Sequence, residues 1–167
     1  MEHIDKAVEI LKTAILLERK GKAFYTQVAR QSESKSAKKI FEMMAEEEDA
    51  HIGFLVKQFK NYADHHEFLV NETPHEEEDA HIDILTEQIK KEISAAGFEA
   101  AAISAAIDFE NRAIEVYSGR ASKATNPNEK ALYQMLAKWE STHHQLLYQL
   151  NEDLKEQIWN DNNFWPF

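Results

Sequence analysis

The stretch FEMMAEEEDAHIGFL, residues 41–55, places ionisable side chains on the apolar face of a helix. Spacings of three and four residues define that face, which consists of Phe41, Met44, Glu48, His51 and Leu55. Such spacing is typical of an amphipathic helix and predicts that Glu48 and His51 are buried. Because a buried carboxylate is destabilising unless it is paired, protonated or bound to a metal, this stretch indicates a polar site inside a helical core.

The same arrangement occurs a second time in the chain. A shift of 92 residues aligns residues 14–51 with residues 106–143 without a gap, with 10 identities in 38 positions. The matched polar pairs are Glu18/Glu110, Tyr25/Tyr117, Glu48/Glu140 and His51/His143. Chance sharing of helix-forming residues explains the matched alanines, but it does not easily explain polar residues matched on apolar faces.

Periodic apolar residues predict four long helices. These helices span residues 5–29, 35–62, 98–121 and 127–158. Ser34 and Asn126 are candidate N-caps, and Pro127 takes the first helical position of the last helix. Because the loops within the first pair and the last pair are short, each pair predicts an antiparallel hairpin.

A long link joins the two hairpins and contains a short amphipathic segment through Ile82, Leu85, Ile89 and Ile93. A link of this length permits a crossover, which separates ferritin-like bundles from simple up-and-down bundles. We therefore expect an all-α, ferritin-like four-helix bundle. Its single domain, residues 1–167, would comprise the hairpin 5–62, the crossover 63–97, the hairpin 98–158 and the tail 159–167.

Composition supports this fold class and excludes several classes of function. The 167 residues include only 4 Gly and 3 Pro, and no Cys, which removes disulfides and thiolate metal sites. A net charge of −11 disfavours nucleic-acid binding and suits cationic ligands. No apolar run is long enough to span a membrane, and the start MEHIDKAVEI lacks the pattern of a secretory signal. We therefore expect a cytoplasmic protein that binds neither nucleic acid nor membrane.

The four repeated glutamates should lie at one height in the bundle. In an antiparallel hairpin, residues at equal distance from the turn are level. The midpoint of Glu18 and Glu48 falls at position 33, and that of Glu110 and Glu140 at position 125, each inside a predicted turn. Each pair is about 15 residues, or roughly 22 Å, from its turn. If the hairpins pack face to face, the glutamates and the two repeated histidines meet in one layer.

This layer has the composition of a dinuclear metal site. One Glu from each of two helices, with Glu-x-x-His from each of the other two, is the di-iron carboxylate arrangement of helical bundles. The predicted ligands are Glu18, Glu48, His51, Glu110, Glu140 and His143. Four carboxylates neutralise two divalent cations, imidazoles suit iron, and carboxylates also accept manganese. The alternative is a polar core whose groups satisfy one another.

Tyr25 and Tyr117 lie two turns after Glu18 and Glu110 on the same apolar faces. A buried tyrosine needs a partner for its hydroxyl group. We predict that each hydroxyl donates a hydrogen bond to a ligand carboxylate and so orients it. Simple packing is the alternative.

With AILLERKGKAFY…EEEDAH and AAIDFENRAIEVY…KWESTHH, the chain resembles the rubrerythrin family of the ferritin-like superfamily over both hairpins. The resemblance implies two iron ions per chain, with manganese or a mixed metal pair also possible. It implies the reduction of hydrogen peroxide in oxidative-stress defence, or the oxidation of Fe(II), by a homodimer or larger homo-oligomer. The residues that it assigns to catalysis are Glu18, Glu48, Glu110, Glu140, Tyr25 and Tyr117.

Two departures from the family pattern bear on function. Typical rubrerythrins carry a C-terminal rubredoxin domain with a four-cysteine iron site, whereas this chain has no cysteine. We therefore expect an external electron donor, such as a rubredoxin-like protein or a reductase. Typical members also have an extra glutamate one turn after the third-helix ligand, where this chain has Ala113. A ferritin- or bacterioferritin-like storage ferroxidase and a structural or sensor bundle stabilised by metal stay open as alternatives.

A further Glu-x-x-His lies in the crossover, because EEEDAHI at residues 76–82 repeats EEEDAHI at residues 46–52. No paired hairpin repeat accompanies it. We interpret Glu78 and His81 as part of a solvated acidic face, with an auxiliary metal site as the alternative. The aromatic tail from Trp159 onward either packs back on the bundle or contributes to a dimer surface.

Overall fold

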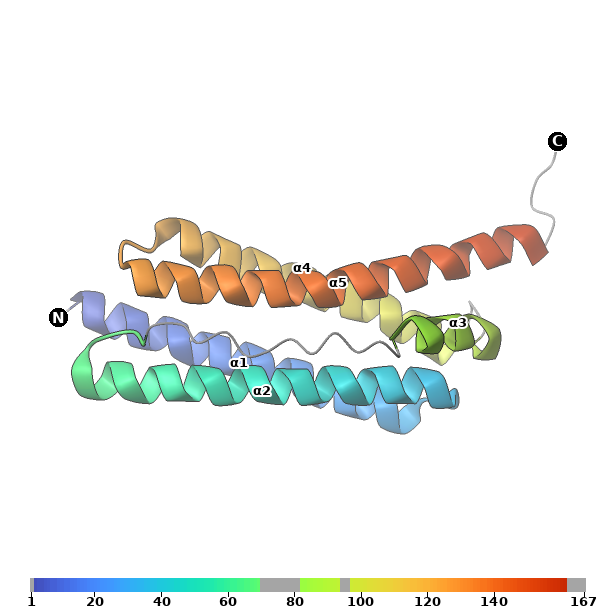
Figure 1. Ribbon diagram of the computed structural model, residues 1–167, viewed down its shortest axis with the longest axis horizontal. Coiled ribbons are helices and arrows are strands. Elements are labelled where there is room, and N and C mark those ends of the chain that lie inside the picture. The colour runs from blue at the N-terminus through green and yellow to red at the C-terminus, as the bar shows by residue number, and fades with distance from the viewer. Residues whose placement is uncertain (1, 70–81, 94–96, 162–167) are drawn as a thin grey trace.

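The described part of the chain consists of helices and their connections. The computed structural model describes residues 2–69, 82–93 and 97–161 (Figure 1). The helices are α1 (Glu2–Gln31), α2 (Lys35–His65), α3 (Ile82–Glu92), α4 (Phe98–Lys123) and α5 (Pro127–Asp161). No strand occurs within the described ranges. In those same ranges, no helix is both long enough and apolar enough to cross a membrane.

Local sequence signals explain where the long helices begin and end. The Ser34 side chain accepts a hydrogen bond from the Ala37 amide at 3.1 Å, which caps α2. The Asn126 side chain accepts hydrogen bonds from the amides of Asn128 and Glu129 at 2.9 and 3.2 Å, which caps α5. At the other end of α2, His66 takes the left-handed conformation, with φ 56°, and the helix stops there.

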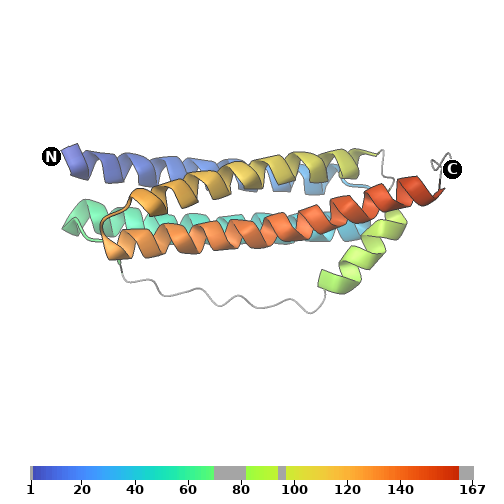
Figure 2. The same cartoon turned by 90° about the horizontal axis from the view of Figure 1, so that it is seen from above.

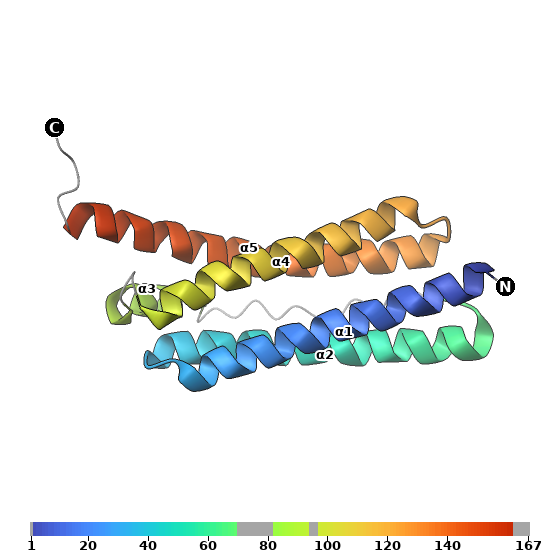
Figure 3. The same cartoon turned by 180° about the vertical axis from the view of Figure 1, so that it is seen from behind.

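The long helices form two antiparallel hairpins, α1 with α2 and α4 with α5, as predicted (Figure 1). Viewed from behind, α1 and α4 run side by side in opposite directions, and the two hairpin turns lie at opposite ends of the bundle (Figure 3). Consequently, α2 and α4 run in the same direction. That direction requires a crossover along the length of the bundle, so the predicted all-α bundle with one long crossover is confirmed.

The short helix α3 packs obliquely across one end of the bundle (Figure 2). Its buried residues Leu85 and Ile89, and Ile93 directly after its end, belong to the same apolar cluster as residues of α2 and α5. The N-cap Ser34 and Ser36 in the first turn of α2 hold the last residue of α3, because their hydroxyls donate to the Glu92 carboxylate. The amphipathic segment predicted within the crossover is therefore a helix that closes the bundle.

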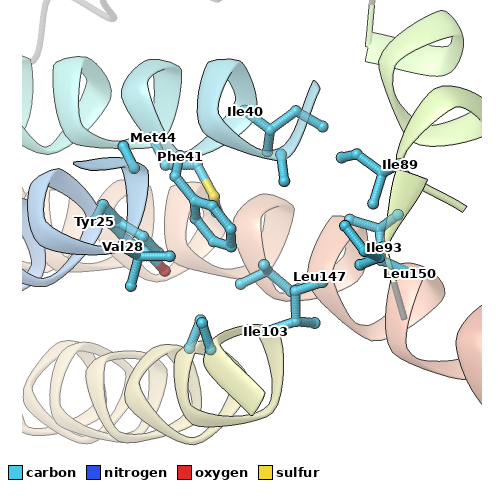
Figure 4. Close-up of a cluster of buried hydrophobic side chains, with 14 of the residues drawn as sticks. Tyr25, Val28, Ile40, Phe41, Met44, Ile89, Ile93, Ile103, Leu147 and Leu150 are labelled. Carbon is cyan, nitrogen blue, oxygen red and sulfur yellow. The ribbon is translucent and has the colours of Figure 1, made fainter. Parts of the chain in front are cut away.

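Two apolar clusters fill the bundle, one toward each end. One contains Tyr25, Phe41, Ile103 and Leu147 and extends to Ile89 of α3 and to Ile93, which follows that helix (Figure 4). The other contains Leu11, Leu55, Tyr117, Leu132 and Leu136. On every long helix, the predicted ligand residues separate the members of one cluster from the members of the other. The predicted polar residues therefore lie between the two apolar clusters.

The observed helix ends differ from the predicted ends by a few residues. The first helix begins at Glu2 rather than Asp5, and the second continues to His65 rather than ending at Tyr62. The last helix runs to Asp161, so Trp159 belongs to α5 and not to the predicted tail. Residues 162–167 of that tail, and the Glu78 and His81 pair, lie outside the described residues.

Candidate metal centre

Six ionisable side chains lie together in the middle of the bundle, and every long helix contributes at least one. We call this set the polar layer, and it consists of Glu18 of α1, Glu48 and His51 of α2, Glu110 of α4, and Glu140 and His143 of α5. These are the six residues that the sequence analysis selected. Each is buried, with at most 6% of its surface exposed.

The polar layer divides into two overlapping groups of possible ligands. The His51 group contains Glu18, Glu48, His51 and Glu140. The His143 group contains Glu48, Glu110, Glu140 and His143. Within each group, one donor atom per residue lies within 4.8 Å of the others. Because Glu48 and Glu140 belong to both groups, cations held in the two groups would share their carboxylates.

Both imidazoles turn their Nδ1 atoms toward the carboxylates. His51 Nδ1 lies 3.0 Å from Glu18 Oε2 and 3.3 Å from Glu140 Oε1. His143 Nδ1 lies 3.4 Å from Glu110 Oε1 and 3.5 Å from Glu48 Oε1. The Nδ1 atoms are therefore the histidine donors that a metal in this layer would use.

The two predicted tyrosines hydrogen-bond across the bundle. Tyr25 Oη donates to Glu110, and Tyr117 Oη donates to Glu18. Each tyrosine therefore holds the carboxylate of the opposite hairpin. Burial and the nearby carboxylates raise the pKa of both tyrosines well above the usual value, so both hydroxyls stay protonated as donors.

The carboxylates shared by the two groups are the hardest to ionise without a metal. Burial, with repulsion from Glu18, raises the pKa of Glu48 to about 9. Burial and repulsion from Glu18 also raise the pKa of Glu140 well above its usual value. Without metal, burial therefore favours the protonated form of both shared carboxyls.

The carboxyls of Glu18 and Glu110, which we call the outer carboxylates because each belongs to only one group, have lowered pKa values instead. Burial raises the pKa of the Glu18 carboxyl, but hydrogen bonds that include those to His51 and Tyr117 outweigh burial and hold it below its usual value. The Glu110 carboxyl is likewise held low by His143 and Tyr25 in spite of its burial. Without metal, the layer thus favours ionised carboxylates at Glu18 and Glu110 and protonated carboxyls at Glu48 and Glu140.

Hydrogen bonding within the protein does not satisfy this layer. Five of its atoms are buried and lack a hydrogen-bond partner: Glu48 Oε1, Glu110 Oε2, Glu140 Oε1, Glu140 Oε2 and His143 Nδ1. Buried polar atoms almost always have partners, so a polar core that satisfies itself does not describe this layer. Carboxylate oxygens and imidazole nitrogens are the donor set that iron and manganese accept. The residues present therefore fit a pair of such ions.

Sequence reasoning missed Glu47, which contacts the layer from its rim. Its Oε2 lies against Nε2 of His143, although its side chain is 53% exposed. Glu47 lies next to the apolar face of α2 and not on it, so helical periodicity gave no signal. A cavity of about 340 Å³ lined by Met43, Glu47, Thr142 and His143 opens at this rim.

Gly21 is a second residue that the sequence analysis did not select. A Cβ atom there would lie 3.0 Å from Glu48 Oε2 and 3.0 Å from a ring carbon of Phe109. The absence of a side chain lets α1 approach the shared carboxylate closely. Under the 92-residue shift, Gly21 corresponds to Ala113, which is 1% exposed and offers no donor group.

Comparison with known proteins agrees with this geometry. A family model described as Rubrerythrin matches residues 9–150, which include both hairpins and the whole polar layer. No curated protein and no solved structure matches the chain. The match suggests a di-iron protein and oxidoreductase activity in general, and the polar layer is compatible with both.

Proposed function

The chain belongs to the rubrerythrin family, and on that premise we propose that it is a di-iron peroxidase that reduces hydrogen peroxide to water. The proposal includes two iron ions per chain, a homo-oligomeric assembly and an external electron donor. A donor is included because the chain contains no cysteine with which to hold a second iron site of the rubredoxin type.

The observation that carries the proposal is the sharing of Glu48 and Glu140 by two ligand groups. A structural site for one metal needs only one such group. Two groups joined by common carboxylates would hold two cations next to each other, which would suit the two-electron cleavage of an O–O bond. The five unpaired buried donor atoms of the layer support the same assignment.

Two ferrous ions bound in this layer would supply the two electrons that convert hydrogen peroxide and two protons into two molecules of water. Glu18 and His51 would hold one ion, Glu110 and His143 the other, and the shared carboxylates both. The hydroxyls of Tyr25 and Tyr117 fix the outer carboxylates in place.

The surrounding packing limits what else reaches the site. Leu11, Leu55 and Leu136 on one side, and Phe41 and Leu147 on the other, exclude bulk water along the bundle axis. A dry core of this kind strengthens electrostatic interactions and suppresses side reactions. The cavity at Glu47 and His143 offers a small oxidant a route from the surface.

The test is anaerobic loading with ferrous iron, followed by mixing with hydrogen peroxide or with oxygen. We expect two irons per chain, consumption of one peroxide for every two irons oxidised, and faster oxidation by peroxide than by oxygen. Glu48→Ala and Glu140→Ala should lower turnover by more than about 100-fold. Loss of a residue that only hydrogen-bonds to a metal ligand already costs up to about that factor, and loss of a ligand should cost more. Full peroxide consumption by either variant contradicts the proposal.

The buried Ala113 favours a second candidate, an iron-storage ferroxidase, because the layer then lacks a seventh carboxylate and is symmetric. Such a protein takes up iron far beyond two ions per chain and oxidises it with oxygen. The same loading experiment separates the candidates. Two redox-silent ions that neither oxidant changes would instead indicate a bundle that metal only stabilises.

A further inference from the structure

The repeat places different residues beside its two histidines. Under the 92-residue shift, Glu47 corresponds to Trp139, so the position before each shared glutamate carries a carboxylate in one hairpin and an indole in the other. The six residues of the polar layer obey the repeat, but these two neighbours break it.

On one side of the layer, both nitrogens of His143 have carboxylate neighbours. Its Nδ1 faces Glu110 and Glu48 at 3.4 and 3.5 Å, inside the layer. Its Nε2 contacts Glu47 Oε2 at the rim. With Nδ1 free to bind a metal, Nε2 carries the ring proton and donates it to the Glu47 carboxylate.

On the other side, the His51 ring lies flat against Trp139. The ring centroids are 4.5 Å apart and the planes differ by 10°. Stacking fixes the plane of the ring but supplies no charge to its outer nitrogen. Among the residues that the structure describes, no carboxylate contacts His51 Nε2.

A carboxylate that accepts the outer N–H of a metal-bound histidine fixes the tautomer, orients the ring and makes the inner nitrogen a stronger donor. Building on the proposed function, in which both groups bind metal, we propose that Glu47 is a positioning residue that makes the two metal positions unequal. Through His143, Glu47 gives the His143 group the higher affinity for a divalent cation, so this group fills first.

The size of the effect follows from the exposure of Glu47. Removal of such a hydrogen-bond partner lowers metal affinity by about 10–100-fold. Because the Glu47 side chain is 53% exposed, solvent screens part of its charge, and the lower end, about tenfold, is expected. The second position, which holds His51, should change little.

The experiment titrates metal-free protein with Co²⁺ and follows the visible absorption of bound cobalt, with metal per chain measured by elemental analysis. Wild type should bind in two steps of different affinity. Glu47→Ala should weaken the tighter step by about tenfold. Glu47→Gln keeps an acceptor oxygen but no charge, so its affinity at this step should lie between those of wild type and Glu47→Ala. Glu46→Gln is the matched control, because it removes the same charge from the adjacent exposed residue.

Two further backgrounds assign the effect to one histidine. In a His51→Ala chain, Glu47→Ala should still weaken the remaining tight step, whereas in a His143→Ala chain it should have no further effect. Equal effects in the two backgrounds, or identical isotherms for Glu47→Ala and Glu46→Gln, overturn the inference. If wild type binds no metal at all, the proposed function fails instead, so the two failures are distinguishable.

Discussion

At the scale of single residues, four chemically identical glutamates divide into two kinds by position. Glu18 and Glu110 each accept a hydrogen bond from a tyrosine and lie beside a histidine, and their pKa values are lowered. Glu48 and Glu140 lie between them, and their pKa values are raised. Metal binding must therefore release protons from the two shared carboxyls, which makes metal affinity rise with pH.

The close approach at Gly21 leads to a prediction about one methyl group. Gly21→Ala should increase helix propensity by up to about 1 kcal/mol, but its Cβ would displace Glu48 Oε2 or Phe109 by a few tenths of an ångström. We expect little net change in the stability of metal-free protein and a severalfold loss of metal affinity. Gly119→Ala, whose Cβ would meet nothing within 4 Å, should stabilise the protein and leave the affinity unchanged. Co²⁺ titration and urea unfolding measure the two quantities, and equal affinities in both variants would contradict the argument.

At the scale of the helices, the caps matter for stability and not for the metal centre. Ser34 accepts from the Ala37 amide and contacts Glu92, so it ties α3 to the start of α2. Ser34→Ala should lower the free energy of unfolding by about 1–2 kcal/mol. Metal content should not change, because Glu48 lies roughly 21 Å further along α2.

Urea unfolding and elemental analysis test this separation. Ser118→Ala is a suitable control, because Ser118 is exposed within α4 and caps no helix. It should leave the stability unchanged or raise it slightly, since alanine has the higher helix propensity. If Ser34→Ala bound clearly less metal per chain than wild type, the end of the helix and the metal centre would be coupled, which contradicts this prediction.

Features set by local pattern could be predicted from the sequence at this scale. The spacing of Glu48 and His51 on one helical face, and the equal distances of Glu18 and Glu48 from their turn, depend only on helix geometry. The same holds for the N-cap at Ser34. The described structure places all six selected side chains in one layer.

Features set by packing between hairpins could not be predicted. The pairing of Tyr25 with Glu110 and of Tyr117 with Glu18 depends on how the hairpins face each other, which no spacing within one helix specifies. Glu47 was missed for a related reason, because an exposed residue reaches His143 of another helix only in the folded bundle.

At the scale of the whole molecule, acidic side chains lie both on the surface and in the interior of the bundle. The net charge is −11, and four of the acidic groups lie in the polar layer. Two apolar clusters must therefore stabilise a fold that includes a costly layer between them. Cations that enter the layer remove that cost, so we expect metal binding and folding stability to be linked.

The linkage predicts how the stability of metal-free protein depends on pH. The folded-state pKa values of Glu48, about 9, and of Glu140 are raised above their unfolded values. Their contribution is therefore fully present below about pH 4.5, the unfolded value, and is lost as pH rises toward 9. The lowered pKa values of Glu18 and Glu110 make stability depend on pH only below their unfolded values, where stability falls as the pH falls.

Between pH 6 and 8.5, metal-free protein should thus lose stability at about 1 kcal/mol or more per pH unit, the value for one proton. Urea unfolding in the presence of a chelator measures this slope. Glu48→Gln should reduce this slope by about the contribution of one proton, because the amide binds no proton, whereas Glu140 and His143, whose pKa values are also raised, keep the remainder. The surface charge is unchanged in this variant, so a smaller slope excludes general repulsion as the cause. Protein loaded with Mn²⁺ should not lose stability over the same range, because the cations have already displaced the protons. A metal-free midpoint that stays constant from pH 6 to pH 8.5 would mean that the shared carboxyls are ionised in the bundle without metal.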